Sequence, residues 1–239
     1  MLLAPTKSIL LMLLAYFAGS IPFGYIVSMT YGGIDIREHG SGNVGMTNVF
    51  RTLGPLPGAI TLLLDALKGY LVVLLSLRWI PPIEFGYNYP MWGVIICLIS
   101  FLTVLGHSFP IWLGFKGGKS VAVSLGILAA LMSWWIAVPI AIFLIVSGIS
   151  RYVSLGSMIS AISVPVLFII YHTFPHAGYS SDSIFIAFAC ILAVLVLIRH
   201  ASNIKRLLKG TENKFGIKIE KPVSIEKIEL PGQNPDDEI

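Results

Sequence analysis

The chain has 239 residues, of which 56% are hydrophobic and only 12% are charged, with a formal net charge of +4 and a mean hydropathy of +0.84. Soluble domains carry roughly a quarter charged residues, so this composition excludes an ordinary soluble protein and indicates an integral membrane protein. The two cysteines, Cys97 and Cys190, lie in apolar runs and indicate neither a disulfide framework nor a metal site.

Hydrophobic runs of membrane length recur along the chain, and crossing the hydrocarbon takes about 20 apolar residues. They predict an all-α polytopic membrane protein, with a single domain over residues 1–215 and a polar cytoplasmic tail over 216–239. We predict seven transmembrane helices, near residues 7–29, 57–80, 91–107, 119–134, 135–150, 155–172 and 182–199. The run 119–150 also fits one long helix, but the adjacent Trp134 and Trp135 favour two helices and a tight turn, because tryptophan prefers the membrane interface.

Basic residues divide unevenly between the two sets of loops. Lys7 and Arg78 fall on the side of the loops at 80–90 and 172–182. The other side carries Arg37, Arg51, Lys116, Lys119, Arg151, Arg199 and the basic residues of the tail. Positive residues collect on the cytoplasmic side, so we predict an external N-terminus and a cytoplasmic C-terminus. The positive charge then suits an anionic leaflet of the lipid bilayer and anionic substrates, and it does not indicate nucleic-acid binding.

A first polar block, residues 40–51, reads GSGNVGMTNVFR and lies between two apolar runs. Glycine allows backbone N–H groups to converge on an anion, because no side chain prevents a close approach. Ser41, Thr47 and Asn48 add hydrogen-bond donors, and the guanidinium of Arg51 can bind two phosphate oxygens. The density of such donors favours an anion-binding loop over a plain polar turn.

Two charged residues, Asp65 and Lys68, follow within the second apolar run. Their spacing of three residues places them on one helix face. Charges inside a membrane helix are functional candidates, although a structural ion pair is the simpler interpretation here.

A second polar block begins at Gly106-His107 and continues as FKGGKS over residues 115–120. It differs from a nucleotide-binding phosphate loop, because Leu113 stands where that pattern requires glycine. An anion site remains plausible in physical terms. Gly117 and Gly118 can present N–H groups, Lys119 supplies a cation, and a helix starts there with its positive dipole end.

A third block, RHASNIKRLLKGTE, follows the last apolar run. On a continuing helix, His200, Asn203 and Arg206 share one face. A purely basic juxtamembrane helix needs neither the histidine nor the asparagine, and histidine is the usual proton carrier near neutral pH. This block therefore predicts a site as well.

Taken together and in this order, SGNVGMTNVFR, GHSFPIWLGFKGGKS and RHASNIKRLLKGTE resemble the bacterial glycerol-3-phosphate acyltransferases that use acyl-phosphate. The resemblance covers roughly residues 8–215. It implies a seven-helix protein of the bacterial inner membrane, active on the cytoplasmic side without a cofactor or metal. The implied reaction acylates the sn-1 hydroxyl of glycerol-3-phosphate, in the first acylation of phospholipid synthesis. The product is 1-acyl-glycerol-3-phosphate (lysophosphatidic acid), and the implied donor suggests a functional link to the enzyme that makes acyl-phosphate.

The resemblance also assigns roles to residues. It implies that Ser41, Arg51 and Lys119 bind glycerol phosphate and that the Gly117–Gly118 turn holds the acyl-phosphate group. His107, His200 and Asn203 would orient the hydroxyl or stabilise developing charge, and either a histidine or the leaving phosphate accepts the proton. The whole expected substrate-binding set comprises Ser41, Gly42, Asn43, Thr47, Asn48, Arg51, Gly117, Gly118, Lys119, Ser154, Arg206 and Glu212.

Two residues depart from the family pattern: Ser120 and Val123 stand where glycine and threonine are usual.

The alternative function is a transporter or channel for a phosphorylated solute, with the same loops forming a vestibule. The basic blocks all lie on one predicted face, and no internal repeat is evident, which weighs against it. A purely structural membrane protein would leave the polar blocks unexplained.

Overall fold

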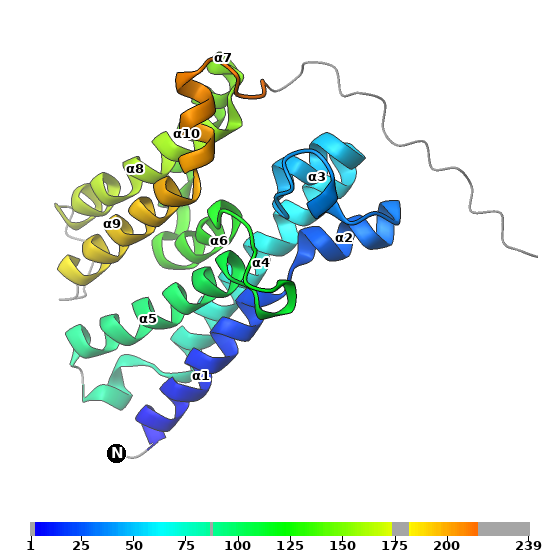
Figure 1. The fold of residues 1–239 in the computed structure, drawn as a ribbon. Helices are drawn as coiled ribbons and strands as arrows, with labels where there is room; N and C mark the ends of the chain where they lie inside the picture. The colour runs from blue at the N-terminus through cyan, green and yellow to red at the C-terminus, as the bar shows by residue number, and fades with distance from the viewer. Residues whose placement is uncertain (1–2, 87, 174–181, 215–239) are drawn as a thin grey trace, which may run out of the picture.

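The computed structural model describes residues 3–86, 88–173 and 182–214, and the predicted tail over 216–239 lies outside them. The described residues form helices and connecting turns, with no strand among them (Figure 1). The α-helices are α1 (Leu3–Ser20), α2 (Phe23–Gly32), α3 (Met46–Leu53), α4 (Pro55–Trp79), α5 (Tyr89–Ser108), α6 (Val121–Met132), α7 (Ala137–Ser150), α8 (Val153–Thr173), α9 (Asp182–Arg199) and α10 (Ala201–Leu208). Short 3-10 helices are η1 (Ile36–Glu38), η2 (Pro82–Phe85), η3 (Ile111–Leu113) and η4 (Ser133–Ile136).

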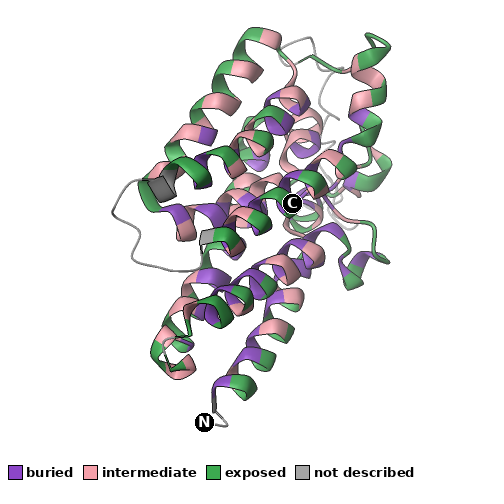
Figure 2. Ribbon diagram, turned by 90° about the vertical axis from the view of Figure 1, so that its left-hand side faces the viewer, coloured by how far each residue is buried: buried purple, intermediate pink, exposed green. Residues whose placement is uncertain are grey.

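The helices carry the apolar lengths that a membrane requires. In the described part of the chain, five helices are long and apolar enough to cross a bilayer, or up to six if α9 and α10 are counted together as one bent span. Large apolar side chains point outward from them, among them Leu63 and Ile149, which are 66% and 83% exposed. Figure 2 shows exposed residues along the outer faces of the bundle and buried ones between the helices. Outward apolar faces of this kind suit contact with lipid.

The stretch from Val121 to Ser150 is two helices, as its tryptophan pair predicted. By length and apolar composition alone, its 30 residues could also form one membrane span. A straight helix of that length would separate its ends by about 45 Å. However, Lys119 contacts Asn203, Asn203 contacts Glu212, and Glu212 contacts Ser154 at the start of α8. The two ends therefore lie at the same end of the bundle, so α6 leads away from that end and α7 returns to it, through the 3-10 turn that contains Trp134 and Trp135 stacked at 4.6 Å.

Glycine allows the central helices to pack at close range, as in other membrane bundles. At Gly19 and Gly106, an added Cβ would collide with the backbone of α5 and of α1, respectively. Gly69 and Gly126 have the same relation between α4 and α6. These two pairs of glycines bring α1 close to α5 and α4 close to α6, and α5 and α6 are the helices on either side of the second polar block.

The bundle has two distinct ends. At one end, the Lys7 ammonium forms an ion pair of 2.6 Å with Glu84 and donates to the Trp79 carbonyl at 3.3 Å. The start of α1, the end of α4 and η2 thus lie together, as expected from the predicted placement of Lys7 and the loop at 80–90 on one side. The opposite end gathers α3, α10 and the segment that connects α5 to α6 (Figure 1).

Candidate active site

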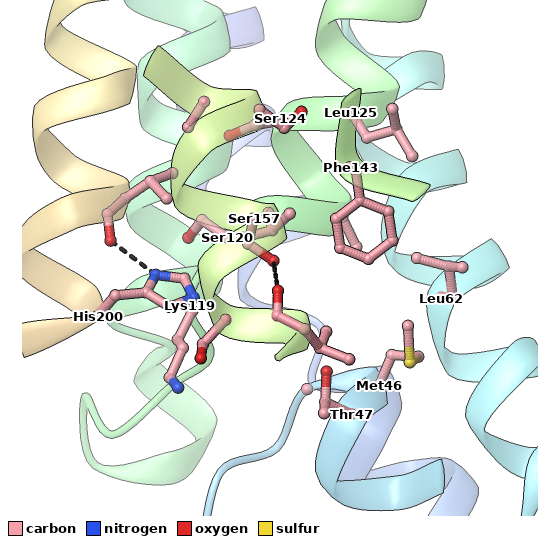
Figure 3. Close-up of a pocket in the computed structure, with 18 of the residues that line it drawn as sticks. Met46, Thr47, Leu62, Lys119, Ser120, Ser124, Leu125, Phe143, Ser157 and His200 are labelled. Carbon is pink, nitrogen blue, oxygen red and sulfur yellow. Dashed lines mark hydrogen bonds between the residues drawn. The ribbon is translucent and has the colours of Figure 1, made fainter. Parts of the chain in front are cut away.

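One pocket, which we call the main pocket, joins a polar head to an apolar arm and has a volume of about 320 Å³. The polar head is lined by Ser41, Asn43, Thr47, Asn48, Arg51, Asp65, His107, Lys119, Ser154, His200, Asn203, Arg206 and Glu212. The apolar arm runs between α6, α7, α8 and α9 and is lined by Leu125, Leu128, Ile136, Ile140, Phe143, Leu144, Val164, Leu192 and Val196. Figure 3 shows Lys119 and His200 on one side of the pocket and Met46, Leu62 and Phe143 on the other.

The loop of the first block is built around the buried side chain of Asn48. Its Oδ1 accepts from the Ser41 N–H at 2.8 Å, and its Nδ2 donates to the carbonyls of Ile36 and His39 at 3.2 and 2.9 Å. Both amide hydrogens are therefore used inside the loop. Asn48 therefore holds together the loop that presents Ser41 to the pocket.

The helix that follows this loop, α3, carries Thr47 and Arg51 to the pocket. No hydrogen bond of the Arg51 guanidinium is found among the described residues. Burial lowers the pKa of Arg51, and the nearby negative charge of Glu212 raises it in part. A guanidinium remains charged at any physiological pH, so Arg51 offers the head an unengaged cation.

The second block is held by Arg199, whose role the sequence did not reveal. Its guanidinium donates to the carbonyls of Gly117 and Gly118, at 2.9 to 3.1 Å, and lies 5.2 Å from the Phe109 ring centroid. Arg199 thereby fixes the turn before Lys119. The only sequence signal was its place beside His200, directly after the last apolar run.

Gly117 and Gly118 require a correction. We expected their N–H groups to face a bound phosphate, but these groups donate to the carbonyls of Ser108 and His107, at 3.2 and 3.1 Å. Glycine is needed here for space, because a Cβ at Gly118 would collide with the His107 ring and one at Gly117 with its carbonyl. The turn therefore packs on His107 and aims Lys119 at the pocket.

The third block also differs from its prediction. The helix does not continue straight, because α9 and α10 meet at a bend of 58° at His200. Nδ1 of His200 lies 2.8 Å from the Val196 carbonyl (Figure 3). A carbonyl only accepts hydrogen bonds, so Nδ1 carries the hydrogen and Nε2 of the neutral ring is an acceptor. Beyond the bend, α10 carries Asn203 and Arg206 to the pocket.

Glu212 connects the third block to α8. Its carboxylate accepts from Asn203 Nδ2 and Arg206 Nε at 2.6 Å each, and from Ser154 Oγ at 2.7 Å. Burial opposes its ionisation, but these hydrogen bonds outweigh it, so the pKa of Glu212 lies below the usual value. An ionised Glu212 orients Asn203, whose Oδ1 accepts from the Lys119 ammonium.

The ammonium of Lys119 is a partly buried cation of the head. The pKa of Lys119 is lowered to about 8, and burial is the largest cause. The positive charges of Arg206, Arg199 and Arg51 lower this pKa further, whereas the negative charge of Glu212 raises it. Several cations thus converge on one small space. An anionic ligand would relieve their mutual repulsion.

Most of the residues predicted from the three blocks meet in the main pocket. Those that do not line it are Gly42, Gly117 and Gly118. Gly42 and Gly117 line a second, polar cleft together with Arg199. Asp65 was missed as a pocket residue, because its spacing from Lys68 favoured an ion pair alone. In the described residues, no group of three or more His, Cys, Asp or Glu side chains could hold a metal ion.

An apolar helical bundle with a cationic head beside an apolar arm defines a membrane protein suited to phosphorylated amphiphiles. The family described as glycerol-3-phosphate acyltransferase matches residues 9–210, and the chain belongs to this family. Curated relatives carry the same description. Those from Thermosynechococcus vestitus and Carboxydothermus hydrogenoformans are each 43% identical, over 212 and 208 residues, covering 87% of this chain and 94% and 96% of the relative.

Solved structures agree with this assignment. The chain is similar to PlsY (YgiH), an integral membrane glycerol 3-phosphate acyltransferase, in its glycerol 3-phosphate form, with a TM-score of 0.74 and 35% identity. For the lysophosphatidic acid form of the same protein, the TM-score is 0.72 and the sequence identity is 34%. Each comparison covers 88% of this chain and 96% of the solved one.

Proposed function

We propose that this protein transfers an acyl chain from acyl-phosphate to the sn-1 hydroxyl of glycerol-3-phosphate. The products are 1-acyl-glycerol-3-phosphate and inorganic phosphate. The observation that carries the proposal is the continuous main pocket, in which a head rich in cations adjoins an arm of apolar side chains. Such a pocket accommodates one phosphate-bearing acceptor and one acyl chain side by side, and family membership favours this enzyme over the transporter alternative.

Each part of the pocket has a role in this proposal. Ser41, Arg51 and Lys119 bind the phosphate of glycerol-3-phosphate, and the arm between α6 and α9 takes the acyl chain. The phosphate of the donor lies at the start of α6, where first-turn N–H groups lack intrahelical partners. Holding the two anions together is the main task, because acyl-phosphate is an activated mixed anhydride and needs positioning more than a strong nucleophile.

In the reaction, the sn-1 oxygen bonds to the acyl carbon, and the bond from that carbon to the phosphate oxygen breaks. Nε2 of His200 is an acceptor for the hydroxyl proton, and the departing phosphate is another. Asn203, held between Lys119 and Glu212, orients the hydroxyl. His107 stabilises charge on the donor.

We also infer seven crossings, with an external N-terminus and with the main pocket on the cytoplasmic side of a bacterial inner membrane. The return of α7 to the end from which α6 starts supports an odd number of crossings, and the basic residues collect at that end. This side matches a water-soluble acceptor made in the cytoplasm. It would also link the protein functionally to the enzyme that supplies acyl-phosphate.

The test is an assay of purified protein in detergent micelles with acyl-phosphate and glycerol-3-phosphate, in which phosphate release and the lipid product are both measured. We expect product only with both substrates, and none when acyl-CoA replaces acyl-phosphate or glycerol replaces glycerol-3-phosphate. Equal activity with acyl-CoA would overturn the donor assignment, and phosphate release without lipid product would overturn the transferase assignment.

A further inference from the structure

A buried cluster of three polar side chains lies beneath the head of the main pocket. Asp65 and Lys68 come from α4 and His107 from α5, and they are 1%, 6% and 6% exposed. Asp65 and His107 line the pocket, whereas Lys68 lies behind them. Burying three such groups is unfavourable unless each is paired, so their contacts indicate what the cluster does.

The ammonium of Lys68 is surrounded by acceptors. It lies 2.8 Å from Asp65 Oδ1 as an ion pair, donates to the Ile21 carbonyl at 2.8 Å, and lies 3.1 Å from Nδ1 of His107. The Ile21 carbonyl is at the break between α1 and α2, so Lys68 connects three helices. An ammonium has three hydrogens and no lone pair, so Lys68 can only donate to the Ile21 carbonyl and to Nδ1 of His107. Asp65 Oδ1 is its ion-pair partner and has no hydrogen bond among the described residues.

These contacts decide the tautomer of His107. Because Lys68 can only donate, Nδ1 of His107 must accept, and the ring hydrogen is on Nε2. The alternative, an Nδ1–H donated to Asp65 Oδ1, spans a longer 3.5 Å and would leave two hydrogens facing each other. Asp65 instead balances the charge of Lys68. His200 has the opposite tautomer, and no hydrogen bond of its Nε2 is found in the part of the chain that the structure describes.

The Nε2 edge of His107 lies against Gly118, in the wall of the main pocket. A Cβ at Gly118 would collide with Nε2 and Cε1 of this ring, so only glycine fits beside that edge. Within the described part of the chain, no hydrogen bond of Nε2 is found, and His107 lines the main pocket. The group presented there is thus a neutral N–H donor beside Lys119.

We propose that Asp65 and Lys68 are positioning residues that hold His107 as an Nε2–H donor to an oxygen of the bound acyl-phosphate. The inference rests on the proposed function, because the donor substrate supplies that oxygen. Electron density moves onto the oxygens of the acyl-phosphate as the sn-1 oxygen attacks. A fixed N–H at this place therefore stabilises the transition state more than the ground state.

Two matched variants separate this role from simple packing. In His107→Gln the side-chain amide reaches the Nε2 position and keeps a donor there, but it provides a poorer acceptor for the Lys68 ammonium. In His107→Asn the amide reaches only the Nδ1 position, so it keeps an acceptor for Lys68 and loses the donor. We expect kcat of His107→Asn to fall about 10- to 150-fold with little change in the KM for glycerol-3-phosphate, and His107→Gln to keep most of kcat. The reverse order, or equal kcat in both variants, overturns the inference.

Lys68→Met tests the positioning step. In the wild-type background we expect kcat to fall, because the imidazole is no longer held in one tautomer. In the His107→Gln background the same change should leave kcat nearly unaltered, because an amide has no tautomer to select. An equal loss in both backgrounds would contradict the coupling and indicate a purely structural role.

Nitrogen-15 NMR of histidine-labelled wild-type protein supplies a readout that does not depend on the activity of any variant. His107 should show its hydrogen on Nε2, with the resonance assigned through His107→Gln or His107→Asn, whichever folds, and a hydrogen on Nδ1 overturns the inference. Failure of the proposed function is distinguishable, because wild-type protein would then lack acyl-phosphate-dependent product in the assay above while the tautomer remained as stated.

Discussion

Lys119 provides a quantitative test of the polar head. We expect Lys119→Met to reduce kcat/KM for glycerol-3-phosphate, because methionine keeps an apolar stem of similar length and removes the charge. A hydrogen bond to a charged group contributes about 1.5–3 kcal/mol, which corresponds to a loss of about 10- to 150-fold. The matched control is Lys116→Met, because Lys116 is an exposed neighbour that does not line the main pocket.

The pH profile gives the same residue a second signature. With a pKa of about 8 in the free enzyme, Lys119 is mostly charged below that pH and loses its proton as the pH rises through it. The phosphate of the acceptor is already fully ionised there, because its second pKa is about 6. We therefore expect kcat/KM to decline above about pH 8, since this parameter reports the ionisation of free enzyme and substrate.

Lys119→Arg separates charge from geometry. A guanidinium keeps its proton beyond pH 12, so the alkaline decline should disappear even if the absolute rate is lower. Two results would refute the reasoning: kcat/KM unchanged in Lys119→Met, or the same alkaline decline in Lys119→Arg. Either one would place the acceptor phosphate away from Lys119.

Three further outcomes are expected. Arg51→Ala should raise the KM for glycerol-3-phosphate at least about tenfold while the protein still inserts, because an unengaged cation is removed, and steady-state kinetics beside the Arg37→Ala control measures this. His200→Gln and Asn203→Ala should depress kcat more than apparent affinity, and a loss confined to thermal stability would instead assign them to packing. Cysteines placed at residues 40, 115 and 205 should react with an impermeant reagent only from the cytoplasmic side, and one at residue 85 only from outside. Labelling of 115 and 205 from opposite sides would contradict the shared site.

Much of the fold was predictable, because membrane helices are recognised by length and apolarity. The predicted helix near 182–199 coincides with α9, and the pair at 119–134 and 135–150 corresponds to α6 and α7. The separation of α1 from α2 at Pro22 was not predicted, because proline is tolerated in apolar helices and the apolar pattern continues across it. The bend at His200 was missed for a similar reason. Side-chain periodicity describes the faces of a straight helix and carries no information on where the axis turns.

The site was predictable in composition and less so in its contacts. Charged and polar residue types in a hydrophobic chain identify the residues that gather at one end, and these largely line the main pocket. Their partners depend on backbone geometry that residue types do not encode. The N–H groups of Gly117 and Gly118 are used within their own turn, and the Asn48 amide is used by its loop. Nothing in the sequence distinguishes a donor that faces a ligand from one that faces a carbonyl.

Ser120 shows how a departure from the family pattern can preserve the site. Its φ of +62° is in the left-handed region that favours glycine, the residue usual at this position. A side chain there costs about 1–2 kcal/mol. Its Oγ lies 2.5 Å from Ser108 Oγ and 3.3 Å from the Val104 carbonyl, and each such bond returns about 0.5–1.5 kcal/mol. The hydroxyl thus offsets the strain of its own backbone, and the turn that presents Lys119 keeps the shape that glycine would give it.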